Sequence, residues 1–361
     1  MRAKWFLVLL TTALLAAGCG GGSDSGSGSD TQAEDAPTIA LFLPESKTTR
    51  YEAFDRPLFE AKVKALCANC KLVYNNADQD AGKQQQQFEA ALAQGADVLV
   101  LDAVDAVAAA SLVNQAKQKK VPVIAYDRLI SGIPYEYYVS FNNVRVGEAQ
   151  GQALLDALNA NGTAAKGKIV MINGSPTDPS SADYKTGAHN ILDGKVQIGR
   201  EFDTPDWSPD KAQQQMEQAI TALGRENIVG VLSANDGMAG GAIAAMKRAG
   251  YTTLPPITGQ DAELAAVQRI LTGEQYMTIY LDIRSEAEKS AELAVALTKG
   301  EQPPATTKVN NGAADIPAFL LDPIAVTADK VKDTIVKDGF YKPSEICAGA
   351  VAAACAKAGI Q

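Results

Sequence analysis

Acidic, amide and basic side chains follow several predicted strands, at positions where they could hydrogen-bond a polar ligand. Residues 121–126 are predicted to form a buried strand, and Asp127 and Arg128 stand where that strand should end. In open α/β sheets, ligands bind at the carboxyl ends of the strands. An acceptor carboxylate beside a guanidinium donor suits a polar ligand. The pair is also consistent with a structural ion pair, but its place at a strand end favours ligand binding.

Three further polar residues and one aromatic residue occupy comparable positions later in the chain. Asp178, Asn235 and Asp261 each lie near the end of a predicted strand, and Trp207 lies in a loop after another. Asn and Asp also cap helices without any ligand, and this alternative applies to Asp127, Asn235 and Asp261. Trp207 could belong to the core, but its loop-like neighbours predict a partly exposed ring.

Strands and helices alternate along the chain. The first predicted strands lie at 38–43, 71–74, 96–101 and 121–126. Helical patterns of suitable length separate them, which predicts a parallel sheet covered on both faces. The pattern starts afresh near residue 144, so we expect an α/β fold of two lobes, each a doubly wound parallel sheet, facing a cleft. Further strands beyond residue 277 exceed what a second lobe needs and predict a multi-strand hinge.

Composition and charge narrow the class of protein. The chain has 361 residues, of which 46% are hydrophobic and 21% charged, enough for two domains with ordinary cores. Its formal net charge of −9 argues against a nucleic-acid partner. The excess of acidic residues is explained by a solvated surface.

The first residues have the pattern of an export signal. A short basic region precedes an apolar run at 5–17, shorter than the roughly 20 residues that span a bilayer. The run ends in Leu-Ala-Ala-Gly-Cys at 15–19, which resembles the lipobox of bacterial lipoproteins. We therefore predict a lipoprotein signal peptide at 1–18, lipidation of Cys19 and a flexible tether at 19–36. An ordinary signal peptide is the alternative; in the lipoprotein case the protein is extracytoplasmic and lipid-anchored to the cell membrane, on its periplasmic face or at the cell surface.

Four cysteines remain after Cys19, namely Cys67, Cys70, Cys347 and Cys355. An even number outside the cytoplasm predicts disulfides, and four cysteines allow three pairings, among which the sequence does not choose. The spacing of Cys67 and Cys70 also occurs in redox motifs and metal sites. Because this pair follows a helical pattern instead of opening a helix, we favour structural disulfides.

Several motifs together resemble those of a known family. They are Ala-Tyr-Asp-Arg at 125–128, Gly-Ser-Pro at 174–176, Ala-Asn-Asp at 234–236, Gly-Gln-Asp-Ala at 259–262 and Asn-Asn-Gly at 310–312. Their order and spacing resemble the periplasmic xylose-binding proteins and the related multi-sugar-binding proteins of ABC import systems, from about residue 38 to 344. The resemblance implies a type I periplasmic-binding-protein fold, with two α/β lobes joined by three hinge strands.

The resemblance also divides the chain into lobes. It implies a first lobe of residues 37–141 plus 280–305 and a second lobe of residues 142–279 plus 306–345. Residues 346–361 are then a C-terminal tail.

The family pattern implies a set of ligand-binding residues. Carboxylates, amides and guanidinium groups would hydrogen-bond sugar hydroxyls, and aromatic rings would cover the apolar face of the sugar. The implied residues are Arg50, Tyr51, Asp127, Arg128, Asp178, Ser180, Trp207, Asn235, Asp261 and Leu281.

The chain departs from that pattern at four of its positions. Tyr51 replaces a tryptophan, Ser180 an asparagine, Leu281 a lysine and Asn142 a hinge aspartate. Loss of the lysine removes a charge-assisted donor, so the ligand could lack the hydroxyl that lysine serves. Lys47 is an alternative donor.

The resemblance implies a monomeric binding protein without cofactor or metal. It would bind one monosaccharide, xylose or a related pentose or hexose, by lobe closure and deliver it to an ABC permease. The alternative is a sugar or signal-molecule sensor that docks on a chemoreceptor or receptor kinase. An enzyme is disfavoured, because paired carboxylates alone would suggest only glycoside hydrolysis. Repressors that share the fold are excluded by the export signal and the missing helix-turn-helix.

Overall fold

The computed structural model describes residues 36–361. The predicted signal peptide, Cys19 and nearly all of the predicted tether lie outside these residues. Residues 36–361 form one compact unit. Within them, no helix combines the length and the apolar character that crossing a membrane requires.

A seven-stranded sheet forms the first lobe. Its strands are β1 (Thr38–Leu43), β2 (Lys71–Asn76), β3 (Val98–Leu101), β4 (Val123–Tyr126), β5 (Tyr137–Phe141), β10 (Thr307–Asn310) and β11 (Asp315–Leu321). They lie in the order β10-β11-β5-β4-β3-β1-β2, and only the β10–β11 pair is antiparallel. Every residue of β3 and β4 is buried, as expected for central strands of a sheet covered on both faces.

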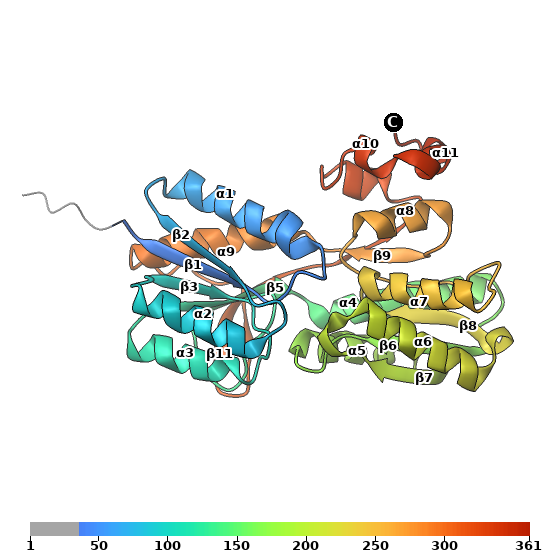
Figure 1. Ribbon diagram of the computed structural model, residues 1–361, viewed down its shortest axis with the longest axis horizontal. Helices are drawn as coiled ribbons and strands as arrows, with labels where there is room; N and C mark the ends of the chain where they lie inside the picture. The colour runs from blue at the N-terminus through green and yellow to red at the C-terminus, as the bar shows by residue number, and fades with distance from the viewer. Residues whose placement is uncertain (1–35) are drawn as a thin grey trace, which may run out of the picture. The chain divides into compact units, whose positions relative to one another are not determined.

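Four helices cover this sheet. Helices α1 (Arg56–Leu66) and α9 (Ile283–Thr298) lie on one face, and α2 (Ala81–Ala93) and α3 (Ala109–Gln118) lie on the other (Figure 1). Buried alanines of α9 pack with Phe59 and Val63 of α1 in one core. Phe88 of α2 and Leu112 of α3 belong to a separate core beneath the opposite face. The sheet is therefore fixed from both sides, which fixes the loops at its carboxyl edge.

The second lobe has a smaller set of strands. They are β6 (Lys168–Asn173), β7 (Gln197–Asp203), β8 (Ile228–Ser233), β9 (Met277–Tyr280) and β12 (Ile324–Thr327). The parallel sheet β7-β6-β8 and the antiparallel pair β9–β12 are linked by single bridges, Val231 to Ile257 and Gln260 to Ile279. Residues 257–261, which end in Asp261, therefore join the two groups of strands through these bridges and form no longer strand of their own.

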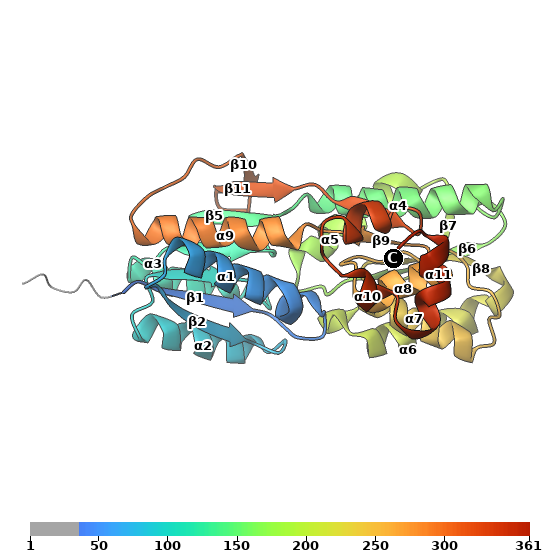
Figure 2. The same cartoon turned by 90° about the horizontal axis from the view of Figure 1, so that it is seen from above.

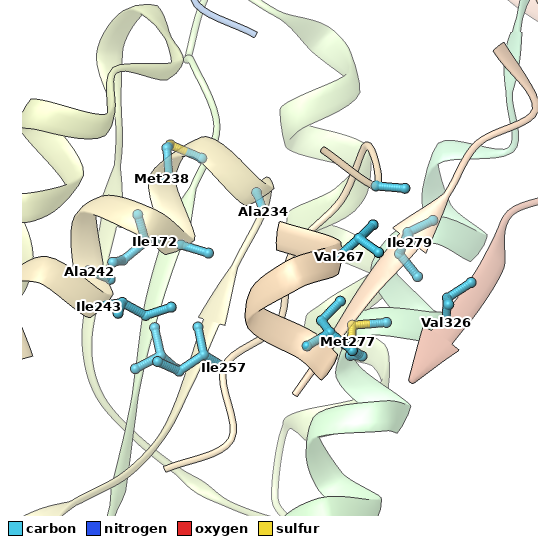
Figure 3. Close-up of a cluster of buried hydrophobic side chains, with 14 of the residues drawn as sticks. Ile172, Ala234, Met238, Ala242, Ile243, Ile257, Val267, Met277, Ile279 and Val326 are labelled. Carbon is cyan, nitrogen blue, oxygen red and sulfur yellow. The ribbon is translucent and has the colours of Figure 1, made fainter. Parts of the chain in front are cut away.

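Five helices pack around these strands. They are α4 (Asn143–Ala160), α5 (Pro179–Leu192), α6 (Pro209–Leu223), α7 (Asp236–Arg248) and α8 (Leu264–Thr272). Figure 3 shows side chains of α7, α8 and β9 in the apolar core, among them Met238, Val267 and Met277. Helices α4 and α5 approach closely at Gly147, where a Cβ would lie 1.9 Å from the carbonyl oxygen of Tyr184. Only glycine at this position lets the two helices pack at that distance.

The chain passes between the lobes three times, after β5, β9 and β11. At the hinge, the amide of Asn142 donates to the carbonyl of Leu321 at 2.9 Å. Asn142 also caps α4 by accepting a hydrogen bond from the amide of Arg145. The predicted fold, two doubly wound lobes joined by three hinge strands, is confirmed.

The predicted lobe boundary at residue 306 is wrong. Strands β10 and β11, assigned from the sequence to the second lobe, belong to the sheet of the first, because β11 pairs in parallel with β5. Figure 2 shows β10 and β11 on the side of β5. Buried Ile316 and Ala318 pack in the core that also contains Leu112. The sequence predicts a strand here but carries no signal for the sheet that it joins.

The C-terminal segment packs on α8. It contains a π-helical turn, Lys332–Val336, followed by α10 (Pro343–Ile346) and α11 (Ala352–Lys357). The side chain of Gln268 on α8 donates to the carbonyl of Ile346 at 3.1 Å. The predicted structural disulfides pair Cys67 with Cys70 and Cys347 with Cys355.

Four aromatic residues join this segment to the first lobe, and we call them the aromatic cluster: Phe54, Tyr280, Phe340 and Tyr341. Phe54 precedes α1, and its ring stacks on that of Phe340 with centroids 4.1 Å apart. Tyr341 and Tyr280 meet Phe54 and Phe340 edge-on, at 5.4 and 5.2 Å. An apolar contact thus connects the lobes close to the hinge strand β9.

Candidate functional site

A cavity lies between the lobes at the carboxyl ends of strands from both sheets. Its empty volume is about 300 Å³, including its opening to solvent. Eight of the ten predicted ligand-binding residues line it: Arg50, Tyr51, Asp127, Arg128, Asp178, Trp207, Asn235 and Asp261.

The other two predicted residues, Ser180 and Leu281, do not line the cavity. Leu281 is fully buried in the apolar core of the second lobe. Ser180 lies in the first turn of α5, where its hydroxyl accepts a hydrogen bond from the side chain of Asn143 at 3.1 Å. Neither side chain is therefore placed to contact a ligand in this cavity.

Asp127 is held at the end of β4 by groups of its own lobe. Its carbonyl oxygen accepts hydrogen bonds from the hydroxyls of Tyr138 and Ser140, at 3.1 and 2.6 Å. One carboxylate oxygen accepts from the Tyr51 hydroxyl at 3.0 Å, and the other lies 3.5 Å from Nη1 of Arg50. Asp127 as a whole is 7% exposed and lines the cavity, where its carboxylate can accept hydrogen bonds.

Arg50 is clamped from behind by two carboxylates. Asp55 accepts from its Nε and Nη2 at 3.0 and 2.7 Å, and Glu286 on α9 accepts from Nη2 at 2.5 Å. Burial alone would lower the pKa of Arg50, but Asp55, Asp127 and Glu286 raise it well above its ordinary value. The guanidinium stays charged, with Nη1 on the side of Asp127.

Arg50 directly precedes a π-helical turn, Tyr51–Asp55, and its partner Asp55 is the last residue of that turn. This turn places Tyr51 on the cavity and Phe54 in the aromatic cluster. Single π-helical turns occur frequently at functional sites. One short segment thus contributes to both contacts between the lobes.

Arg128 connects the two lobes directly. Its Nη1 donates to the carbonyl of Ala103 at 3.1 Å, and its Nε lies 3.4 Å from Asp102 and 3.0 Å from Asp178 of the second lobe. Asp102 is fully buried, and within residues 36–361 neither of its carboxylate oxygens has a hydrogen-bond partner. Burial raises the pKa of Asp102 well above its usual range, an effect that Arg128 opposes.

Asp178 and Trp207 form one unit on the second lobe. Asp178 caps α5 by accepting from the amide of Ser180 at 2.9 Å, and its other oxygen accepts from Nε1 of Trp207 at 3.2 Å. The indole lies against Gly174, where a Cβ would come within 2.0 Å of the ring. Trp207 is only 6% exposed, so the expectation of a partly exposed ring is wrong. The small exposed part of the residue is on the cavity.

Asn235 and Asp261 are the other two predicted residues of the second lobe that line the cavity. Asn235 caps α7 by accepting from the amide of Met238 at 2.9 Å, so the capping and cavity-lining roles coincide in one side chain. Burial, with Glu263 and Asp127 nearby, raises the pKa of Asp261 to about 7 against the opposing effect of Arg50. The protonation of Asp261 is therefore balanced near neutral pH.

Backbone strain is concentrated around the cavity. Asp127, Trp207 and Asp261 have φ values of 58°, 52° and 92°, a region that residues with a Cβ rarely adopt. Each such conformation costs on the order of 1–3 kcal/mol and is characteristic of functional sites. The surrounding fold therefore holds these three side chains at positions that local preference disfavours.

Three further residues line the cavity without having been predicted from the sequence, namely Thr48, Tyr184 and Gln260. Gln260 lies inside the Gly-Gln-Asp-Ala motif at 259–262, directly before Asp261, and could have been found there. Tyr184 follows Ser180 by one helical turn on α5, so the helical period was an available signal. Thr48 lies in a loop, and no sequence signal distinguishes it.

The cavity offers two guanidinium groups, three carboxylates, two amides and three aromatic rings. Donors and acceptors in this number match a ligand whose hydroxyls each donate and accept. Among residues 36–361, no group of three or more metal-ligating side chains is positioned to hold a metal ion.

Comparison with known proteins shows that the chain is similar to periplasmic binding proteins. The model of the periplasmic binding protein domain family matches residues 39–302. The D-xylose-binding periplasmic protein of Escherichia coli (strain K12) is 36% identical over 313 residues, covering 85% of this chain and 92% of the relative. The multiple sugar-binding periplasmic protein SbpA of Azospirillum brasilense is 32% identical over 336 residues, covering 87% of this chain and 92% of the relative.

A solved structure shares the fold over most of the chain. It is an ABC transporter solute binding protein from Clostridium phytofermentans with bound β-D-glucose, with a TM-score of 0.79 and 28% identity over 86% of this chain and 99% of that one. The relatives are solute-binding proteins and not enzymes. This chain therefore belongs to the periplasmic binding protein family, alongside sugar-binding members, and is a binding protein rather than an enzyme.

Proposed function

We propose that this protein is an extracytoplasmic solute-binding lipoprotein that binds one monosaccharide between its lobes and delivers it to an ABC permease. The proposed ligand is xylose or a related pentose or hexose. The observation that carries the proposal is the cavity itself, in which buried polar groups of both lobes converge. The names of the relatives, which bind xylose, several sugars or glucose, support the ligand class.

The polar residues would divide the ligand hydroxyls between the lobes. Arg50, Asp127 and Arg128 would bind them from the first lobe, and Asp178, Asn235 and Asp261 from the second. Because the ligand touches both sets only when the lobes are together, its binding favours the closed state over the open one. The closed form would then be the one that the permease recognises.

Two aromatic residues would hold the sugar ring. Tyr51 belongs to the first lobe and Trp207 to the second, and both line the cavity. Aromatic faces cover the apolar C–H surface of a sugar, while hydroxyls at the ring edge reach the polar groups. Tyr51 also donates to Asp127, so its ring is fixed before the ligand arrives.

The lipid anchor and the location rest on the sequence. Cys19, in the lipobox-like pattern at 15–19, would carry the lipid and keep the protein at the membrane. Replacement Cys19→Ser should move the protein from the membrane fraction to the soluble fraction. Membrane association unchanged by Cys19→Ser would contradict the anchor without touching the sugar site.

Calorimetric titration of residues 36–361 with pentoses, hexoses and inositol tests the ligand class. The protein should first be unfolded and refolded to remove any copurified ligand. We expect tight one-to-one binding of D-xylose or D-glucose. No heat with any of these compounds would overturn the proposed ligand class.

A further inference from the structure

Tyr184 and Gln260 stand together on the second-lobe wall of the cavity. Tyr184 lies on α5 and is 5% exposed, and its ring meets that of Trp207 edge-on with centroids 6.3 Å apart. Gln260 is 4% exposed and directly precedes Asp261. Both side chains line the cavity and come from segments far apart in the sequence.

The backbone holds Tyr184 firmly. Its carbonyl oxygen lies where a Cβ at Gly147 would come within 1.9 Å, at the tightest approach of α4 to α5. On the next turn of α5, a Cβ at Gly187 would likewise lie only 2.0 Å from the carbonyl oxygen of Val144 on α4. Interlocked glycines therefore fix this part of α5, and the tyrosine hydroxyl has a defined position in the cavity wall.

The hydrogen bonds of these two side chains are incomplete. Nε2 of Gln260 lies 3.5 Å from the Tyr184 hydroxyl and 3.4 Å from Asp261, both long for a hydrogen bond. Within residues 36–361, the Oε1 atom of Gln260 is buried without a partner, and no hydrogen bond has the Tyr184 hydroxyl as its donor. A buried acceptor and a buried donor thus remain available side by side.

Neither of the two other positions that the family pattern implies on this side, Ser180 and Leu281, supplies a hydroxyl donor to the cavity. Ser180, one turn before Tyr184, accepts from Asn143 and does not line the cavity. Leu281 is apolar and enclosed in the core. On the same wall, Asp178 accepts from Trp207, and Asn235 caps α7 through its Oδ1, which leaves the Asn235 amide nitrogen as a further neutral donor.

We propose that Tyr184 and Gln260 are specificity-determining residues that together recognise one hydroxyl of the ligand, Tyr184 as donor and Gln260 as acceptor. The inference rests on the proposed sugar-binding function and names the neutral hydroxyl as the group selected. A site built around such a hydroxyl rejects an analogue that lacks it, because its own buried polar groups are then left unpaired. A carboxylate has no proton to donate to Gln260, and an ammonium has no lone pair to accept from Tyr184, so neither group satisfies Tyr184 as donor and Gln260 as acceptor together.

The test is a titration of the Tyr184→Phe variant with D-xylose, D-glucose and their single-deoxy analogues. We expect Tyr184→Phe to weaken binding of the parent sugar about two- to tenfold, the effect of one neutral hydrogen bond. For the one deoxy sugar that lacks the recognised hydroxyl, the variant and the unmodified protein should bind equally. Tyr251→Phe is the matched control, because its hydroxyl donates to Arg225 on the outer side of the same lobe. It should leave all affinities unchanged.

A second variant separates recognition from packing. Gln260→Met should also weaken binding of the parent sugar, and the double variant should lose less than the product of the two single losses, because both residues serve one hydroxyl. Thermal unfolding checks that each variant is folded.

The outcomes of these titrations are distinguishable. Equal losses on every deoxy sugar, or fully multiplicative losses in the double variant, would overturn the shared-hydroxyl assignment. Unchanged binding by Tyr184→Phe would overturn the inference while leaving the proposed function intact. No sugar binding by the unmodified protein would overturn both.

Discussion

The two regions that join the lobes differ in whether their contacts are complete. In the cavity, Arg128 meets Asp178 at 3.0 Å, yet Gln260 and nearby Asp102 keep buried polar atoms without partners within the described chain. In the aromatic cluster, the ring of Phe54 stacks on that of Phe340 at 4.1 Å, and neither of these two rings has a polar atom to satisfy. A buried polar group without a partner costs about 1–3 kcal/mol.

This difference assigns separate roles to the two regions. Closing the polar cavity without ligand leaves polar atoms unsatisfied, so a ligand that supplies their partners stabilises the closed state. The stacked phenylalanine rings have no polar atom that a ligand could satisfy, so we expect this contact to contribute the same amount with or without ligand. Ligand selection should therefore depend on the cavity, and the apparent affinity on both regions.

The largest expected effect on sugar affinity comes from removing the positive charge of Arg128, which forms an ion pair with Asp178 of the other lobe. Arg128→Met leaves Asp102 and Asp178 without their cation, and we expect the free energy of sugar binding to weaken by about 2–5 kcal/mol. Arg145→Met is the control, because its ion pair with Asp322 at 2.8 Å is exposed at the hinge and should contribute at most about 1 kcal/mol. Calorimetry on both variants gives the comparison. Similar losses in the two variants would mean that the buried ion pair has no special part in binding.

The next effect is a dependence of affinity on pH. The pKa of Asp261 is about 7 in the ligand-free cavity, so part of this group is protonated at neutral pH. A sugar hydroxyl that donates to the ionised carboxylate should bind more weakly as the pH falls below about 7, by at most about tenfold per pH unit. Titrations from pH 5 to 8 measure this slope, and Asp261→Asn should abolish it. A slope that persists in Asp261→Asn would locate the titrating group elsewhere.

The same carboxyl group should affect stability with the opposite sign. Its folded pKa lies above the unfolded value of roughly 3.9, so its stabilising contribution is fully present below pH about 4 and is lost as the pH rises through about 7. Ligand-free protein should therefore lose stability over this range, and Asp261→Asn should lose less. Denaturant unfolding at several pH values measures the difference.

A smaller effect on affinity is expected from the aromatic cluster. Phe54→Leu keeps an apolar side chain but loses the stacking on Phe340, worth about 0.5–1.5 kcal/mol. Because that contact spans the lobes, we expect the variant to weaken all sugars by the same factor, whereas cavity variants change their relative order. Phe319→Leu, within the first lobe near Tyr137, is the control and should lower stability alone. A change in sugar preference in Phe54→Leu would show that the cluster is coupled to the cavity.

The smallest effect on binding should come from the C-terminal disulfide. Replacing Cys347 and Cys355 together by serine opens a short loop with a sequence separation of 8 and should lower the free energy of unfolding by roughly 2–4 kcal/mol. The sugar affinity should stay within about twofold, because neither cysteine lines the cavity. A large loss of affinity would mean that the tail holds the aromatic cluster in place.

How far the sequence predicts this molecule depends on the kind of signal. The buried strands β3 and β4 were predictable because parallel strands covered on both faces are continuously apolar. Polar residues close after such strands, for example Asp127 and Asn235, were predicted to bind ligand because ligands bind at the carboxyl ends of the strands in open α/β sheets. Eight cavity residues were predicted, some from polar residues at strand ends and others, such as Arg50 and Tyr51, only through the family resemblance.

The rest depends on contacts that are distant in sequence. The partner of β11 is β5, and neither strand carries a signal for the other, which is why the lobe boundary was misplaced. Leu281 occupies the position at which the family pattern has a ligand-binding lysine, but the apolar side chain of Leu281 packs into the core. The pairing of Phe54 with Phe340 joins residues that no local pattern relates. Tyr184 reaches the cavity only because glycines let α4 and α5 approach closely.

The most direct test of ligand binding between the lobes is a crystal structure of the protein in complex with D-xylose. We expect one sugar in the cavity, with its ring against Trp207 and its hydroxyls bonded to Asp127 of the first lobe and to Asn235 and Asp261 of the second. The Tyr184 hydroxyl and Gln260 should contact one common hydroxyl of the sugar. Electron density for the sugar outside this cavity, or contacts with one lobe alone in a closed molecule, would contradict binding by lobe closure.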